Sequence, residues 1–211
     1  DVYKRQGDVG ILREIVRHAG IEEIVAVEID PQVVALCRDL LPLHSAGALD
    51  DPRLTLIYAD GLEYLAQSRE TFDLILCDST DPGGPAASLF SDAFYRNCQQ
   101  RLGTGGILAT QNGVPFLQPE ELGGTARRLA DNFADWGFFH AAVPTYIGGS
   151  MAFGWASNSE KVRRTDLDTL RQRFAKSALV TRYYTPEVHQ AAFALPRYML
   201  DLIEAGLQRD S

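Results

Sequence analysis

The sequence predicts an α/β fold, with a mostly parallel sheet and an antiparallel hairpin toward the C-terminal end. Apolar runs of strand length alternate with stretches of helical spacing, and such runs are typical of parallel strands covered on both faces. Two later runs flank the turn-rich residues 144–149, which indicates a hairpin. The expected parallel strands are residues 24–29, 54–58, 74–77 and 107–110, and the expected hairpin strands are residues 138–143 and 150–157.

Helices are predicted between and after these strands. The clearest start is Asp30-Pro31, an N-cap residue followed by proline at the first helical position. We expect this helix to bury Val33, Val34, Cys37, Leu40 and Leu41. The other expected helices cover residues 11–16, 88–102, 119–136, 166–176 and 186–207. Because no linker or repeat interrupts the pattern, residues 1–211 are expected to form a single domain.

The first residues do not resemble the opening strand of such a sheet. That strand should be apolar and should run into the first glycine loop, but only the short, polar residues 1–6 precede Gly7. We therefore expect the chain to lack its first strand. It is expected to be an N-terminally truncated piece of a longer protein, or to begin with residues that are not native.

Composition excludes several classes of function. Twenty Lys and Arg residues against 28 Asp and Glu residues give a net charge of −8, which disfavours nucleic acid as a partner. An apolar run of roughly 18 residues, as a membrane crossing needs, is absent. Cys37, Cys77 and Cys98 include no Cys-x-x-Cys pair, so they indicate reduced thiols in a cytoplasmic protein, without a metal site.

Carboxylates stand after most of the predicted strands. In open α/β sheets ligands bind outside the carboxyl ends of the strands. Like charges gathered at one edge repel unless a cation lies among them, so this pattern predicts a site for a cationic ligand. Taken singly, each acid also fits a helix cap, a turn cap or an exposed strand end. The acids are Asp8, Glu28, Asp60, Asp78 and Asp81, and Gln111 follows the last parallel strand.

The glycine loop is not a dinucleotide fingerprint. Gly-x-Gly-x-x-Gly is missing, since only Gly7 and Gly10 are present, and this argues against NAD. Glu28 nevertheless follows Gly10 by a spacing close to the roughly 20 residues at which an acid binds a ribose diol. A ribose-binding acid without a phosphate loop fits an adenosyl ligand that carries a sulfonium.

Several motifs together resemble the spermidine synthases, the polyamine aminopropyltransferase family, and bacterial members most of all. The most specific is the Asp-Ser-Thr-Asp-Pro-Gly-Gly-Pro loop of residues 78–85, and the resemblance extends from Gly7 to the C-terminal helix. The other motifs are Gly-Asp-Val-Gly-Ile-Leu-Arg-Glu at 7–14, Val-Glu-Ile-Asp at 27–30, Asp-Gly at 60–61, Ser-Leu-Phe at 88–90, Val-Pro-Thr-Tyr at 143–146 and Ala-Ala-Phe-Ala-Leu-Pro at 191–196.

The resemblance implies a class I methyltransferase-like Rossmann fold and transfer of an aminopropyl group from decarboxylated S-adenosylmethionine to putrescine. The products are spermidine and methylthioadenosine, and the donor is a co-substrate, so no cofactor is implied. By analogy Glu28 holds the ribose, Asp60 and Gly61 hold the adenine, Asp8 holds the donor ammonium, and Asp78 is the base. The loop with Pro85 lies against the adenine, and the acceptor contacts are Asp78, Ser79, Thr80, Asp81, Gln111 and Tyr146.

The chain departs from the family in two ways. The family motif Gly-Gly-Gly-Asp-Gly-Gly is Arg-Gln-Gly-Asp-Val-Gly at residues 5–10, and the family's small N-terminal β domain is expected to be missing. The missing N-terminal part leaves open that the chain is an inactive fragment of the synthase. An S-adenosylmethionine-dependent amine N-methyltransferase, which shares the scaffold and the donor site, is the other alternative. The resemblance further implies a homodimer or homotetramer for the full-length parent.

Overall fold

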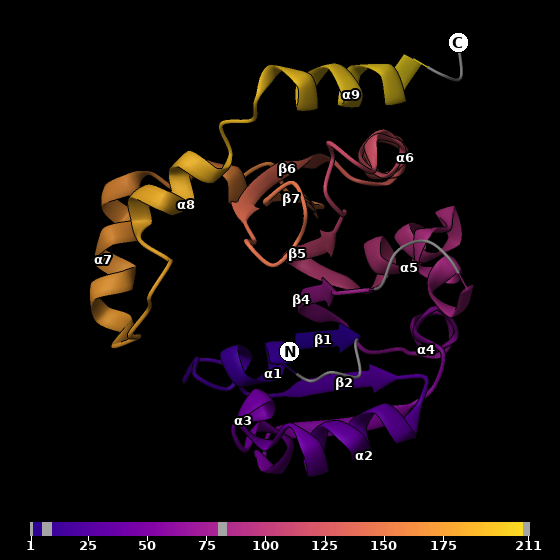
Figure 1. Ribbon diagram of the computed structural model, residues 1–211, viewed down its shortest axis with the longest axis vertical. Helices are drawn as coiled ribbons and strands as arrows, with labels where there is room; N and C mark the ends of the chain where they lie inside the picture. Colours follow the sequence, from indigo (N-terminus) through magenta and orange to yellow (C-terminus); the bar gives the residue numbers. More distant parts are fainter. Residues whose placement is uncertain (1, 6–9, 80–83, 209–211) are drawn as a thin grey trace.

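The computed structural model describes residues 2–5, 10–79 and 84–208, with the backbone alone for residues 2–5 and 85, and builds from them a seven-stranded sheet (Figure 1). The strand order is β3-β2-β1-β4-β5-β7-β6. Neighbours from β3 to β5 are parallel, whereas β7 is antiparallel to both β5 and β6, which confirms the predicted hairpin. The strands are β1 (Val2–Arg5), β2 (Ile24–Glu28), β3 (Leu54–Tyr58), β4 (Phe72–Cys77), β5 (Leu102–Gln111), β6 (Asp135–Ala142) and β7 (Ser150–Ser157).

Helices cover both faces of the sheet, and a buried apolar cluster lies under each layer. Ala26 and Val27, successive residues of β2, belong to different clusters, because side chains of a strand alternate between its faces. One layer holds α1 (Gly10–Ile15), α2 (Pro31–Leu40), α3 (Pro42–Ser45) and η1 (Ala48–Asp50). The other holds α4 (Gly61–Gln67), η2 (Gly84–Phe90), α5 (Asp92–Arg101), α6 (Pro119–Asn132) and α9 (Arg197–Gln208).

The remaining helices follow the hairpin. η3 (Val162–Arg164) leads to α7 (Leu167–Ser177) and α8 (Pro186–Ala192), which pack against each other, and α8 also contacts β6 (Figure 1). Within residues 10–79 and 84–208, no helix is both long and apolar enough to span a membrane.

The expectation that the chain lacks its first strand is wrong. Residues Val2–Arg5 form β1, which pairs in parallel with β2 on one edge and β4 on the other. Lys4, for example, lies opposite Ala26 and Leu76. A strand in this position is held by backbone hydrogen bonds to two neighbours, and Val2 and Tyr3 are residues of high strand preference, so a short run suffices in spite of the charged Lys4 and Arg5.

The predicted helix over residues 186–207 is two helices. α8 ends at Ala192 and α9 begins at Arg197, after Pro196. Proline lacks the N–H that a helix needs and disfavours helical backbone at the residue before it, here Leu195. The predicted helix over residues 88–102 is also divided, because Ser91 caps α5 by accepting a hydrogen bond from the Phe94 N–H at 3.2 Å.

The predicted burial of α2 is only partly correct. Val34 and Cys37 are buried, but Leu40 is 70% exposed and Leu41 is 52% exposed. The helix ends at Leu40 and the chain turns directly into α3, so Leu40 and Leu41 lie at the connection between the two helices and not on the buried face of α2. All three cysteines are buried, as expected for thiols of the core.

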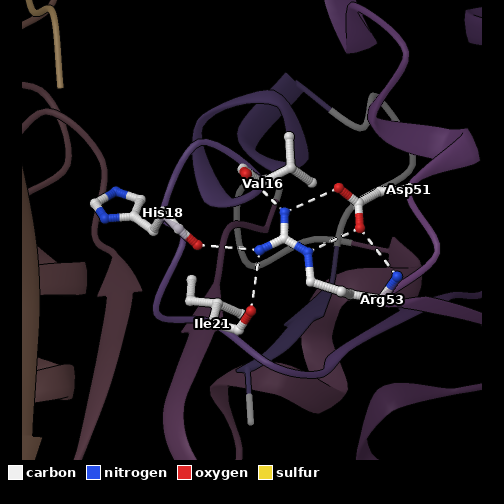
Figure 2. A network of polar contacts seen from close by, with 5 residues as sticks. All are labelled: Val16, His18, Ile21, Asp51 and Arg53. Carbon is white, nitrogen blue, oxygen red and sulfur yellow. Dashed lines mark hydrogen bonds and ion pairs between the residues drawn. The ribbon is translucent and has the colours of Figure 1, made fainter. Parts of the chain in front are cut away.

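Arg53, a partly buried arginine, links the α1–β2 connection to the start of β3 (Figure 2). Arg53 donates from Nε and Nη2 to the two carboxylate oxygens of Asp51, each at 2.9 Å. Its remaining N–H groups donate to the carbonyl oxygens of His18 at 3.0 Å, Ile21 at 2.9 Å and Val16 at 2.7 Å. All five donors of the guanidinium are therefore satisfied, which suits the planar fork of arginine.

We expect Asp51→Asn to lower the thermal unfolding midpoint at pH 7. Hydrogen bonds from the Arg53 side chain lower the pKa of Asp51 from 3.8 to about 2. Because the folded-state pKa lies below the unfolded value, this stabilisation is complete above pH 3.8 and is lost as the pH falls toward 2. Circular dichroism melts of both proteins between pH 7 and pH 2.5 should show the two midpoints converging. A difference that stayed constant over this range would contradict the assignment.

Candidate active site

The carboxyl ends of the parallel strands meet at one edge of the sheet, and the predicted site residues follow them there. Strand register fixes this arrangement: Cys77 of β4 lies opposite Arg5 of β1 and Thr110 of β5. Asp78 therefore follows β4 beside Gln111, the last residue of β5. Glu28 ends β2 beside Tyr58 at the end of β3. The structure thus gathers Glu28, Asp60, Asp78 and Gln111 at the edge where open α/β sheets bind ligands.

Glu28 presents a buried carboxylate at this edge. Glu28 is 8% exposed, and its Oε1 atom accepts a hydrogen bond from the Asp30 N–H at 3.0 Å. The backbone is held as well, because the Ala59 N–H donates to the Glu28 carbonyl oxygen at 3.0 Å. An exposed strand-end glutamate, the simpler alternative, is excluded by this burial. A carboxylate fixed by the backbone can accept both hydroxyls of a diol without reorganising.

Asp60 caps α4 and also contacts the loop that follows β4. Its Oδ1 atom accepts hydrogen bonds from the Leu62 N–H at 2.7 Å and the Glu63 N–H at 3.4 Å, so the capping alternative is confirmed. Ser88 of η2 approaches its Oδ2 atom at 3.5 Å. Gly61 is buried at the first position of α4, and η2 also contains the backbone of Pro85. This contact places the segment that follows β3 beside the segment that follows β4.

The described residues that the sequence analysis predicted to contact the acceptor lie on three segments. Asp78 is half-buried and Ser79 is buried directly after β4, and Gln111 is half-buried at the end of β5. Tyr146 lies in the β6–β7 turn and is 54% exposed. That turn is held by its own backbone, with the Tyr146 N–H donating to the Val143 carbonyl oxygen at 3.0 Å. Three of the predicted site residues, Asp8, Thr80 and Asp81, lie outside the described residues.

Sequence reasoning did not anticipate a buried polar cluster next to Gln111. Asn112 is fully buried, and its amide contacts Thr110, Thr125 and Gly154. The signal in the sequence is weak: an asparagine after an apolar strand is usually assigned to a turn. Its partners come from three different elements, and only the folded chain brings them together.

Residues 7–166 match the model of one known protein family, the spermine/spermidine synthase domain. Polyamine aminopropyltransferase 1 of Pseudomonas aeruginosa is 54% identical over 197 residues, which cover 93% of this chain and 69% of the relative. The polyamine aminopropyltransferase of Pectobacterium atrosepticum is 51% identical over 198 residues, with 94% and 69% covered.

Solved structures agree. A spermidine synthase crystallised with the transition state analogue AdoDATO superposes with a TM-score of 0.89 at 30% identity, covering 97% of this chain and 69% of that one. Spermidine synthase from Thermotoga maritima gives a TM-score of 0.86 at 30% identity, covering 97% and 68%. A buried acid at the end of β2, further acids after β3 and β4, and relatives that are more than 50% identical lead to one conclusion: this chain belongs to the spermine/spermidine synthase family.

Proposed function

We propose that this chain transfers the aminopropyl group of decarboxylated S-adenosylmethionine to putrescine, with Asp78 as the general base. Aminopropyl transfer is the reaction of the family to which the chain belongs. The observation that carries the assignment of the site is the acidic edge itself. Glu28 ends one parallel strand, and Asp60 and Asp78 follow two others at their carboxyl ends, where a ligand with several positive charges is attracted to all three acids.

The donor side of the proposed site is the part nearest β2 and β3. The fixed carboxylate of Glu28 is suited to the ribose hydroxyls, and Asp60 with Gly61 to the adenine. Asp8 is proposed to pair with the ammonium of the donor. This pairing would also disfavour intact S-adenosylmethionine, whose carboxylate would be repelled by the aspartate. The loop with Pro85 is proposed to cover the adenine.

The acceptor side is nearest β4, β5 and the hairpin. Asp78, Ser79, Thr80 and Asp81 are proposed to hold one end of the diamine, with Gln111 and Tyr146 along the channel. Asp78 first takes one proton from the ammonium and passes it to water, which frees the lone pair of the amine nitrogen. This nitrogen attacks the aminopropyl methylene carbon bound to the sulfonium, a C–N bond forms, and the C–S bond to that carbon breaks. Sulfur keeps the electron pair, which gives neutral methylthioadenosine.

A base is needed because putrescine is protonated at neutral pH. An ammonium with a lysine-like pKa of about 10.4 costs about 4.6 kcal/mol to deprotonate at pH 7. Positive charge also moves from sulfur to nitrogen during the reaction. A carboxylate beside that nitrogen interacts more strongly as the charge develops, so it stabilises the transition state more than the ground state.

The proposal is tested by incubating the chain with putrescine and either donor. Decarboxylated S-adenosylmethionine should give spermidine and methylthioadenosine in equal amounts, measured by liquid chromatography. Intact S-adenosylmethionine should give no S-adenosylhomocysteine. The opposite pattern would identify an amine N-methyltransferase. Donor binding without any product would identify an inactive fragment of the synthase.

Location and assembly belong to the same proposal. We expect small-molecule substrates as the partners of this chain, a cytoplasmic location, and a homodimer or homotetramer for the full-length parent with a small N-terminal β domain. The support is the family resemblance. Light scattering on the purified parent gives its subunit number directly.

A further inference from the structure

We infer that Asn112 is a positioning residue for the acceptor half of the site, an inference that rests on the proposed function. Gln111 ends β5 directly before the turn of residues 112–118 that leads to α6, whereas Tyr146 lies on the turn of residues 143–149 between β6 and β7. We call these the acceptor-side turns. For both residues to contact one diamine, the two turns must be held at a fixed separation. The buried amide of Asn112 provides that connection.

The amide of Asn112 joins three elements. Its Oδ1 atom accepts hydrogen bonds from the Thr110 hydroxyl at 2.9 Å and from the Gly154 N–H of β7 at 2.6 Å. Its Nδ2 atom donates to the Thr125 hydroxyl of α6 at 2.8 Å. Asn112, Thr125 and Gly154 are buried, so water cannot replace these bonds without a change of structure.

The backbone around Asn112 joins the first turn to β7, the strand that follows the second turn. The Asn112 N–H donates to the Ala152 carbonyl oxygen at 3.0 Å, and the Ala152 N–H donates to the Gly113 carbonyl oxygen at 3.0 Å. Gly113 has a φ of +64°, and a Cβ there would lie 2.5 Å from Oε1 of Gln118, which accepts a hydrogen bond from the Val114 N–H at 3.0 Å. The path of the first turn is therefore fixed where it begins, by the backbone bonds of Asn112 and Gly113.

The two turns also touch each other. A Cβ at Gly148, whose φ is +99°, would lie 2.8 Å from Cγ1 of Val114. Val114 belongs to the first turn and Gly148 to the second, two residues after Tyr146. A shift of Asn112 would therefore move both turns, and with them Gln111 and Tyr146.

The Asn112 side chain also explains why residue 154 is a glycine. A Cβ at Gly154 would lie 2.8 Å from Oδ1 of Asn112 and 2.8 Å from Oγ1 of Thr110. Glycine inside a strand often marks a close approach to the backbone, and here the approaching group is the amide oxygen of Asn112. The strand thus leaves room for this side chain where any other residue would exclude it.

The donor half of the site is separate from this cluster. Glu28 ends β2 and Asp60 follows β3, and the sheet order places β1 and β4 between β2 and β5. The hydrogen-bond partners of the Asn112 side chain lie on β5, β7 and α6. A positioning role therefore predicts that its loss weakens the use of putrescine and leaves the use of the donor unchanged. A purely structural role predicts no such difference.

The experiment measures steady-state kinetics with each substrate varied in turn for the wild type, Asn112→Ala and Thr125→Val. We expect kcat/KM for putrescine to fall by about tenfold to a hundredfold, as a small misplacement of contacting groups can cause. The KM for decarboxylated S-adenosylmethionine should stay within about twofold of wild type, since no contact of the donor side changes. Thr125→Ser keeps the hydroxyl and should therefore have the kinetics of the wild type, unlike Thr125→Val.

Ser157→Ala is the matched control. Ser157 is also fully buried on β7, and its hydroxyl donates to the Gly106 carbonyl oxygen at 2.8 Å, but it lies at the opposite end of that strand. It should lose stability without changing kcat/KM for putrescine. If Asn112→Ala fails to fold, Thr125→Val carries the test, because it leaves the bonds of the amide oxygen in place.

The outcomes separate the two claims. A wild-type chain that makes no spermidine refutes the proposed function, and the inference that rests on it fails too. An active wild type whose Asn112 and Thr125 variants behave like Ser157→Ala refutes the positioning role alone. Equal losses for both substrates would refute it as well.

Discussion

Asp78→Asn is expected to lower kcat for spermidine formation by about 10²-fold to 10⁴-fold, the range that a positioned general base contributes. Asparagine has nearly the shape of aspartate, but it cannot accept the ammonium proton and carries no charge to stabilise the developing positive nitrogen. Asp78 follows β4 beside Gln111, so the change is confined to the acceptor side. The KM for decarboxylated S-adenosylmethionine should therefore change little. Release of methylthioadenosine under saturating substrates measures the effect.

Asp73→Asn is the matched control for this variant. Asp73 lies on the same strand, β4, but it is exposed and precedes the carboxyl end of that strand by several residues. It should keep wild-type kcat. Unchanged kcat in Asp78→Asn would assign the base to another group, and an equal loss in both variants would indicate a general effect of charge or folding.

Local patterns predicted most of the sheet and the edge at which we propose that substrate binds. The strand over Leu54–Tyr58 and the hairpin strand Ser150–Ser157 have the predicted limits, because each is an uninterrupted run bounded by turn residues. Asp30 caps α2 as predicted, accepting a hydrogen bond from the Gln32 N–H at 2.8 Å. The acids after β2, β3 and β4 follow from strand order, since parallel strands end at one edge.

Features that depend on distant residues were not predictable in this way. β1 is held by its two neighbours in the sheet; Val2 and Tyr3 favour a strand, but a run of four residues that ends in two charged ones is too short to stand out in the sequence. The partners of Asn112 are up to 42 residues away in sequence, so no local pattern marks it as a member of the site. Pro196 lies within the predicted helix over residues 186–207 and marks the place where α8 and α9 separate, since proline lacks the N–H that a helix interior needs.

Gly206→Ala is expected to destabilise the chain by about 3 kcal/mol, the upper part of the usual range for overpacking. α6 and α9 cross at Gly123 and Gly206, where the two backbones are in contact. A Cβ at Gly206 would lie 2.5 Å from the Cα atom of Gly123 and closer still to its carbonyl oxygen. These are backbone atoms, so the helices must separate to make room. The buried Met199, on the same helix, would lose part of its packing.

For a chain of this size, that loss lowers the unfolding midpoint by about 6 to 12 °C, which calorimetry or circular dichroism can measure. Gly124→Ala, at the next position of α6, is the matched control. A Cβ there meets only the end of the flexible Arg128 side chain, at 3.1 Å. Because alanine favours a helix over glycine by up to about 1 kcal/mol, this variant should be as stable as wild type or more stable. Opposite signs at these two glycines would establish that the α6–α9 crossing, and not a general intolerance of larger residues, sets the requirement for glycine. Equal effects would refute it.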